Sequence, residues 1–232
     1  MIGPVIDEVR STRPGPERSS AGVQARTIRM EPYTAELGFE IYSKEASRFA
    51  VKLWDTVLEA GKPHGLEVTG PCHIRRIEGG ILAYGADMLL DTNPYEVDMG
   101  YEWMVDLAQE ADFVGKQALK RIKEEGIRRK LVGVEIGGPK LGSYIDNEMI
   151  DFFPVFHDDR RVGQVTSACY SPRLDKNIGF AMVPIELAEL GTALEVETPA
   201  ERTTAEVVQR PFIDPKKEIP KQTLAAADSG TA

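Results

Sequence analysis

The 232-residue sequence contains few of the residues that build disulfide frameworks or metal sites. Its two cysteines, Cys72 and Cys169, lack the Cys-x-x-Cys spacing, and its three histidines, His64, His73 and His157, are scattered along the chain. This pattern excludes a disulfide scaffold and provides no set of zinc ligands. We therefore predict that the protein has no metal site and works in a reducing, cytoplasmic compartment.

Long apolar runs and uncompensated basic clusters are also missing. No apolar stretch approaches the roughly 20 residues that span a bilayer, and the first residues lack the apolar segment of a secretory signal. The 37 acidic residues outnumber the 28 basic ones, giving a net charge of −9, whereas a nucleic-acid surface needs clustered Lys and Arg. We expect neither a membrane nor a nucleic acid as partner. P-loop, dinucleotide-binding, zinc-protease and serine-hydrolase motifs are absent as well.

The N-terminal third begins with a polar segment and continues with strands. Residues 1–24 are rich in Pro, Arg, Ser and Gly and have little apolar periodicity, which is typical of a disordered leader. Ala25–Met30 and Gly38–Tyr42 favour strands. Within the second strand, Glu40 points to the face opposite Phe39 and Ile41, so it faces either solvent or a polar pocket.

A helical period starts after Ser43, the candidate N-cap, and stops at Gly61. Its apolar stripe consists of Ala46, Phe49, Ala50, Leu53, Trp54, Val57 and Leu58. We expect Trp54 on this stripe to be a core anchor. A third, later helix is predicted for Phe113–Glu125, with Asp112 as N-cap, Val114 on the buried face and Lys116 on the wet face.

A second, short helix is predicted for Pro71–Glu78, and it carries two adjacent arginines, Arg75 and Arg76. Adjacent residues on a helix point about 100° apart, so only one of the two can face a given cavity. Either arginine could bind an anionic group of a substrate.

The pattern changes after Arg128 to short strands separated by turn signals. The predicted strands are Leu131–Ile136, Phe152–His157, Val162–Ser167, Ile178–Val183, Ala193–Glu197 and Ala205–Val208. A hairpin turn is predicted at Asp158–Arg161. The fold class is therefore α+β, with a disordered leader at residues 1–24, an α+β domain at 25–128, an all-β barrel at 129–213 and a flexible tail at 214–232.

Tyr33–Tyr42, Tyr-Thr-Ala-Glu-Leu-Gly-Phe-Glu-Ile-Tyr, resembles the Tyr-Thr-Gly-Glu-x-Gly-x-Glu-Ile signature of the glycine-cleavage T-protein family. Further similarities to the family follow in order: Leu53-Trp54, Arg76-Ile77-Glu78-Gly79-Gly80, Thr92-Asn93-Pro94, Asp112-Phe113-Val114-Gly115-Lys116, Gly163-x-Val165-Thr166-Ser167, Ser171-Pro172-x-Leu174 and Lys176-Asn177-Ile178. The resemblance includes the folate-dependent aminomethyltransferases and their demethylase relatives, which act on dimethylsulfoniopropionate or methylated amines.

The resemblance implies a partial T-protein-like folate-binding domain followed by a C-terminal all-β barrel. It further implies a one-carbon transferase that uses tetrahydrofolate as cofactor and a small methylated or aminomethyl-bearing substrate. The resemblance also implies that Glu40 anchors the pterin ring, since a carboxylate suits the ring's paired N–H donors. Tyr33, from the same motif, is expected to line the cofactor cavity, and Arg75 or Arg76 to bind substrate.

Two departures from the family pattern leave alternatives open. Cys72 and His73 stand where aminomethyltransferases carry Arg-Asp, so the demethylase branch competes with glycine cleavage. The family's long N-terminal segment, which supplies the catalytic aspartate, has only Met1–Gln24 as its counterpart here. No catalytic residue is assigned. The alternative to an enzyme is a non-catalytic fragment or subunit that completes a folate site only with a partner chain.

Overall fold

The computed structural model describes residues 18–20, 23–30, 38–43, 45–97, 105–142, 152–216 and 218–219. These residues form two compact units, one up to Cys72 together with the described residues from Lys216 onward, and one from His73 to Pro215. The domain limits predicted at residues 24, 128 and 213 stay predictions. β1 (Arg18–Ser20) lies within the segment expected to be a disordered leader.

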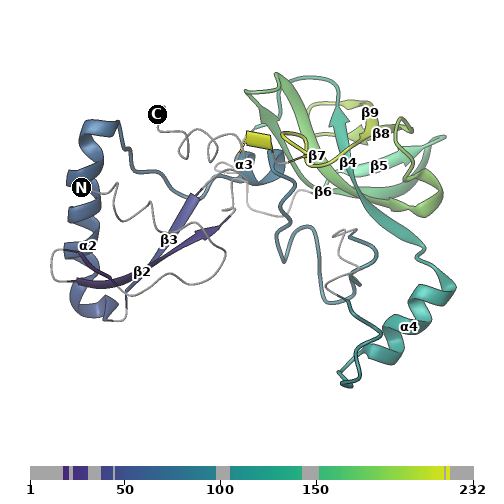
Figure 1. Ribbon diagram of the computed structural model, residues 1–232. Helices are drawn as coiled ribbons and strands as arrows, with labels where there is room; N and C mark the ends of the chain where they lie inside the picture. Colours follow the sequence, from purple (N-terminus) through teal and green to yellow (C-terminus); the bar gives the residue numbers. More distant parts are fainter. Residues whose placement is uncertain are drawn as a thin grey trace. The chain divides into compact units, whose positions relative to one another are not determined.

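The first unit is a three-stranded antiparallel sheet with one long helix (Figure 1). Its strands are β1, β2 (Val23–Met30) and β3 (Gly38–Ser43), in the order β1-β2-β3. α2 (Ala46–Gly61) packs against β2 and β3 and continues as a 3-10 turn, η1 (Lys62–His64). The two strands predicted from the sequence are confirmed.

The predicted start of α2 is wrong, whereas its predicted end at Gly61 is confirmed. Ser43 is not the N-cap, because it is still in β3 and pairs with Ala25; Glu45 takes the N-cap position without a side-chain bond. At Gly61 a Cβ atom would lie 2.3 Å from a side-chain carbon of Leu66. Only glycine therefore fits where the chain folds back.

Trp54 is not a core anchor, because its surface is 54% exposed. The apolar stripe of α2 is wider than the face that the sheet covers. Leu53 is half-buried, and Trp54 lies about 100° around the helix from it. Val51, 75% exposed, shares the uncovered side with Trp54.

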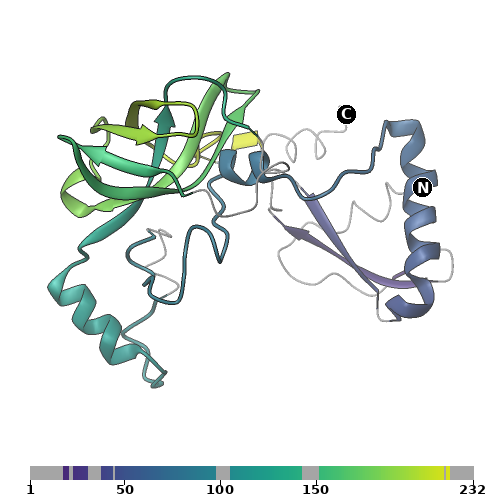
Figure 2. The same ribbon diagram turned by 180° about the vertical axis from the view of Figure 1, so that it is seen from behind.

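The second unit is organised around a closed six-stranded antiparallel barrel, visible from both sides in Figures 1 and 2. The strand order is β4-β7-β6-β5-β8-β9. The strands are β4 (Arg129–Ile136), β5 (Pro154–His157), β6 (Arg160–Ser171), β7 (Lys176–Pro184), β8 (Ala193–Glu197) and β9 (Arg202–Val208). Each predicted strand overlaps one of them, so the predicted all-β barrel is confirmed. A short 3-10 turn, η2 (Ile185–Leu187), follows β7.

The turn residues and the buried apolar side chains explain why the six strands close into a barrel. Asp158 and Asp159, between β5 and β6, both have positive φ angles of 49° and 60°, as a two-residue hairpin of the favoured twist requires. The interior is filled by alternate apolar residues such as Val134, Val155 and Val196, all fully buried. The predicted hairpin at Asp158–Arg161 is confirmed.

α3 (His73–Glu78) lies on the outside of the barrel, against β6 and β7. Ile77 from this helix is fully buried in a second apolar cluster with Leu131, Ile178 and Phe180. The predicted helix over Pro71–Glu78 is thus confirmed, beginning two residues later. This cluster fixes which side of α3 faces the barrel, and so it fixes the directions of the two arginines.

α4 (Lys116–Glu125) begins later than predicted. Gly115, with φ of +92°, interrupts the helical backbone, so Asp112 is not an N-cap and Val114 is fully exposed before the helix. Lys116 is buried, not on a wet face, because its Nζ donates to the Gln109 and Ala111 carbonyls at 2.6 and 3.0 Å.

Candidate functional site

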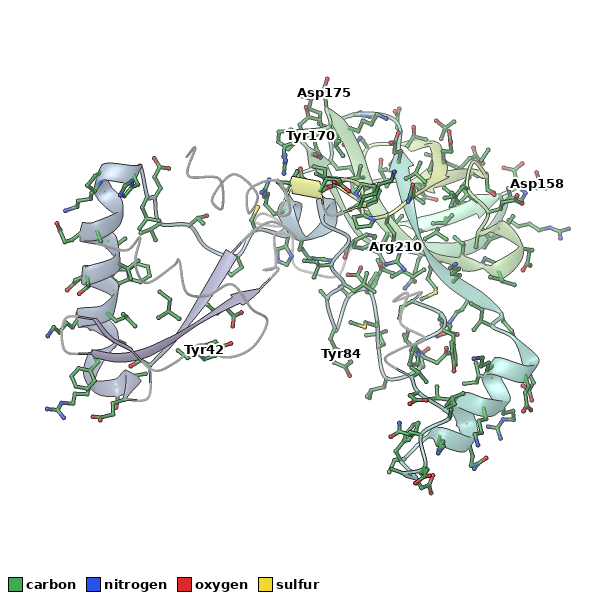
Figure 3. The ribbon with its side chains drawn as sticks, in the orientation of Figure 1. Tyr42, Tyr84, Asp158, Tyr170, Asp175 and Arg210 are labelled. Carbon is green, nitrogen blue, oxygen red and sulfur yellow. The ribbon has the colours of Figure 1, made fainter. Side chains whose placement is uncertain are left out.

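Glu40 lies in the middle of β3, paired in register with Ile28 of β2. Residues two apart in a strand share a face, and Tyr42 accordingly donates its hydroxyl hydrogen to Glu40 Oε2. This hydrogen bond is the main reason why the pKa of Tyr42 is raised above its ordinary value. An ionised carboxylate offers about four lone-pair directions, so one bond from Tyr42 leaves Glu40 able to accept N–H donors from a ligand. Figure 3 labels Tyr42 on this strand.

Tyr33, the second predicted cofactor residue, lies outside the described residues. Its role beside Glu40 stays a prediction.

Arg76 is completely enclosed, with 1% of its side chain exposed. Its guanidinium donates to Asp87 Oδ2 at 2.6 Å, to Ser167 Oγ at 2.7 Å and to the Ile81 carbonyl at 3.2 Å. These bonds join α3, the following loop and β6. They give Arg76 a structural role in the second unit, while its predicted contact with substrate stays a prediction.

Asp87 is the other centre of this network, and sequence reasoning missed it. Its carboxylate accepts hydrogen bonds from Arg76, from the backbone N–H of Ala83 at 2.9 Å, and from the hydroxyls of Thr166 and Ser167 at 2.7 and 2.6 Å. Both oxygens are therefore satisfied, as a buried charge requires. The only signal in the sequence was an aspartate within a turn-rich stretch, which does not reveal a partner on a barrel strand.

His73 begins α3 and is held next to the buried pair. Its Nδ1 accepts a 3.4 Å hydrogen bond from Arg76 Nε. Partial burial is the main cause that lowers the pKa of His73, the positive charge of Arg76 adds to it, and Asp87 opposes it. The ring is therefore held in its neutral form at pH values where a free histidine begins to take up a proton.

Arg75 points away from Arg76, as the helical geometry predicted. Its Nη1 lies 3.7 Å from Glu78 Oε2, and its side chain is 27% exposed. A third arginine, Arg173 in the turn between β6 and β7, places its Nη1 3.6 Å from the same oxygen. Of the two arginines predicted to bind an anionic substrate group, Arg75 is thus the one that solvent reaches.

A polar cavity of about 560 Å³ opens beside the barrel. In its wall, Lys140 Nζ donates to Tyr170 Oη at 2.6 Å, and Tyr170 donates to Asp175. Tyr170 and Asp175 lie together at one end of the barrel in Figure 3. The bond to Tyr170 raises the pKa of Lys140, and the bond from Tyr170 lowers the pKa of Asp175. Sequence reasoning did not find this cavity, because its wall comes from five separate strands, β4, β6, β7, β8 and β9.

The described residues hold no group of three or more His, Cys, Asp or Glu side chains that could bind a metal ion. Within the same part of the chain, no helix has the length and apolar character needed to cross a membrane.

Comparison with known proteins matches two long stretches of the chain to the domains of one family. Residues 16–109 match the GCVT N-terminal domain, and residues 129–214 match the glycine cleavage T-protein C-terminal barrel domain. The aminomethyltransferase of Bacillus pumilus (strain SAFR-032) is 37% identical over 216 residues, covering 89% of this chain and 54% of that protein. The aminomethyltransferase of Geobacillus sp. (strain WCH70) is 39% identical over 199 residues, covering 82% and 50%.

A solved structure agrees on the fold. The glycine cleavage system aminomethyltransferase T from Bartonella henselae superimposes with a TM-score of 0.65 at 23% identity, covering 82% of this chain and 50% of that one. The chain thus spans about half the length of the relatives that it matches. The motif order, the closed C-terminal barrel and these matches lead to one conclusion: the chain belongs to the glycine cleavage T-protein family.

Proposed function

We propose that this chain acts in tetrahydrofolate-dependent one-carbon transfer, moving an aminomethyl or methyl group from a small donor to the folate. The observation that carries the proposal is Glu40, which occupies the glutamate position of the family signature on a regular strand and shares its face with Tyr42. A carboxylate accepts the paired N–H donors of a pterin ring through charge-assisted hydrogen bonds. The relatives named aminomethyltransferase support the reaction class.

The residues divide into three roles under this proposal. Glu40 and Tyr33 hold the pterin ring of the cofactor. Arg75, partly exposed on α3, binds the substrate. The Arg76–Asp87 pair holds α3 against the barrel and so keeps Arg75 in place. The reaction belongs to the cytoplasm, and tetrahydrofolate supplies the acceptor nitrogen.

The donor divides the proposal into two branches. Relatives named aminomethyltransferase favour an aminomethyl group. The Cys72–His73 pair, where the aminomethyltransferase pattern has Arg-Asp, favours a methylated donor such as dimethylsulfoniopropionate or a methylated amine. A transfer assay with each donor, in which tetrahydrofolate products are separated by chromatography, assigns the branch: methylene-tetrahydrofolate identifies an aminomethyl donor, and methyl-tetrahydrofolate identifies a methyl donor.

A second candidate function is a subunit that completes a folate site together with a partner chain. The chain spans about half the length of its relatives. Glu40 is only half-buried, so its hydrogen bonds to a ligand need further residues around the ligand to exclude competing water. Calorimetry of the 232-residue chain with tetrahydrofolate separates the two candidates. Micromolar binding and turnover by the chain alone support the first, whereas binding that appears only after a complementary T-protein segment is added supports the second.

A further inference from the structure

The polar cavity described above lies on the outer surface of the barrel. Glu135 in its wall is flanked in β4 by Val134 and Ile136, whose side chains fill the barrel interior, so Glu135 points outward. The volume of about 560 Å³ is within the range of sites that bind small molecules. The hollow exists because much of the wall has small side chains: Gly137, Gly138, Gly191, Ala193, Thr204 and Ala205.

Lys140 lies in this wall on a backbone that is fixed on both sides. Asn177, with 6% of its surface exposed, donates a 2.9 Å hydrogen bond to the Pro139 carbonyl. The side-chain oxygen of Asn177 accepts another, also of 2.9 Å, from the N–H of Leu141. The position of Lys140 is therefore set by a buried side chain, although Lys140 itself is exposed.

The ammonium group of Lys140 is held over Tyr170. Its Nζ donates to Tyr170 Oη at 2.6 Å and lies 4.0 Å from the centre of the ring. Asp175 Oδ1 is 3.7 Å from Nζ, which is too long for a hydrogen bond. An ammonium group has three N–H donors, so two remain available to a ligand after the bond to Tyr170. Tyr170 and Asp175, labelled in Figure 3, mark this end of the cavity.

Two glutamates face each other in another part of the wall. Glu135 in β4 and Glu206 in β9 are direct cross-strand partners, and like charges in this arrangement repel. Lys176 Nζ forms a 2.8 Å ion pair with Glu135, whereas no described residue gives Glu206 an ion pair or a hydrogen bond. A ligand cation next to Glu206 would reduce the repulsion and give this carboxylate a partner.

The cationic and the acidic parts of the wall are several strands apart. Tyr170 is in β6 and Glu206 in β9, with β7 and β4 between them. Neighbouring strands lie about 4.8 Å apart, so the two positions are separated by roughly 14 Å along the barrel surface and by less in a straight line. An extended peptide spans at most about 3.3–3.6 Å per residue, so three residues, roughly 10 Å, can connect the two charged side chains when both extend toward the ligand.

We propose that the polar cavity binds a short zwitterionic peptide of about three residues, with its carboxylate at Lys140 and its ammonium group at Glu206 and Glu135. Lys140 and Glu206 are the binding residues at the two ends, and Asn177 is a positioning residue for Lys140. All wall residues belong to the second unit, and none has a part in the proposed function. The peptide site is therefore independent of that function.

Triglycine is the probe, because it has both terminal charges and no side chains. We expect it to shift the backbone amide NMR signals of Gly138 and Gly191, which line the cavity, in the 232-residue chain. N-acetyl-triglycine lacks the ammonium group and triglycinamide lacks the carboxylate, so each should bind at least about tenfold more weakly. Free glycine carries both charges but cannot connect the two ends, and it should also bind at least about tenfold more weakly.

Lys140→Gln and Glu206→Gln remove the charge at each end of the cavity in turn. Each should weaken triglycine binding at least about tenfold. The capped peptides assign the ends, because Lys140→Gln should not further weaken triglycinamide and Glu206→Gln should not further weaken N-acetyl-triglycine. Lys52→Gln in α2 and Glu186→Gln in η2 are the matched controls. They alter exposed residues outside the cavity wall and should bind triglycine as the wild type does.

The proposal is overturned if triglycine shifts neither glycine signal, or if the wild type binds free glycine or both capped peptides as tightly as triglycine. Unchanged triglycine binding in both Lys140→Gln and Glu206→Gln overturns it as well. Melting temperatures without ligand should stay close to the wild type in both variants, because the two side chains are exposed. If a variant unfolds, the capped peptides on the wild-type chain decide the question alone.

Discussion

Asp87 and Arg76 form a 2.6 Å ion pair in which both side chains are fully buried, with 0% and 1% of their surfaces exposed. The pair lies where α3, the loop after it and strand β6 meet, and Thr166 and Ser167 complete its hydrogen bonds. A buried pair of this kind adds little net stability compared with an apolar replacement, but breaking it leaves one charge without a partner. The arrangement therefore specifies how α3 sits on the barrel.

Removing one partner of this pair should destabilise the second unit strongly. We expect Asp87→Asn to lower the free energy of unfolding by about 3–5 kcal/mol, because the Arg76 charge stays buried without its counterion. Urea denaturation followed by circular dichroism measures the change. Asp91→Asn is the matched control, since Asp91 pairs with Arg129 at 3.1 Å with its side chain 68% exposed, and it should cost less than about 1 kcal/mol. Equal effects of the two variants would contradict the role assigned to Asp87.

His73 should make stability depend on pH below neutrality. Since the pKa of His73 is lowered in the folded protein from the ordinary value of 6.5, the folded state binds fewer protons than the unfolded chain between the two values. Stability is therefore full above the unfolded pKa and falls as the pH drops below it. One fully coupled proton changes the free energy of unfolding by roughly 1.4 kcal/mol per pH unit. The change for His73 should stay below this value, because its ring is only half-buried.

Burial, Arg76 and Asp87 all act on the pKa of His73. His73→Gln keeps an acceptor for Arg76 Nε and removes the titrating ring. Melting temperatures between about pH 7.5 and 5.5 should fall less in this variant than in the wild type. His64→Gln, which alters an exposed histidine of the first unit, should retain the wild-type slope. If the melting temperature of His73→Gln falls with pH as steeply as that of the wild type, the pH dependence of stability comes from other groups.

Local patterns predicted the barrel well. Strands of alternating apolar residues end at turns that short-range chemistry determines, as at Asp158 and Asp159. This turn sets the first pairs of β5 with β6, and a β-bulge between Val155 and Phe156 then shifts the register. The Arg76–Asp87–Ser167 network could not be predicted in this way. Ser167 is 80 positions from Asp87 and 91 from Arg76, and only the packing of α3 on β6 brings them together.

Trp54 illustrates a different limit of sequence reasoning. The apolar period of α2 correctly predicts a helix, but a stripe wider than one contact face does not tell which residues the sheet covers. The approach of Arg173 to Glu78 could not be predicted for the same reason as the Arg76–Asp87–Ser167 network. The turn after β6, which carries Arg173, comes close to α3 only in the folded unit.

The exposure of Trp54 leads to a prediction that contrasts it with Phe180. Trp54→Ala should change the free energy of unfolding by less than about 1 kcal/mol, as at other exposed positions. Phe180→Ala should cost about 3–5 kcal/mol, because Phe180 is fully buried and its ring stacks on Phe212 with centroids 5.9 Å apart. Urea denaturation of both variants measures the difference. A loss of several kcal/mol in Trp54→Ala would show that its side chain is covered in solution.

Glu40→Gln tests the cofactor role directly, because glutamine keeps the size of the side chain and still accepts the hydrogen bond from Tyr42. It loses the negative charge, so N–H donors of a pterin ring would exchange a charge-assisted bond for a neutral one. We expect tetrahydrofolate affinity to fall by about 1–3 kcal/mol, measured by calorimetry in the form that binds folate, the chain alone or with a complementary T-protein segment.

The melting temperature should stay within about 1 °C of the wild type, because Glu40 is only half-buried and its bond to Tyr42 persists. Glu67→Gln changes an exposed glutamate of the same unit by the same chemistry, so it controls for the loss of one charge and should leave affinity unchanged. Tyr42→Phe removes the donor that occupies one lone pair of Glu40. If the pterin binds through the remaining lone pairs, this variant retains binding within about threefold. If Glu40→Gln binds tetrahydrofolate as tightly as the wild type, the pterin ring binds elsewhere. If Glu67→Gln loses as much affinity as Glu40→Gln, the loss comes from the change in net charge and not from a bond to Glu40.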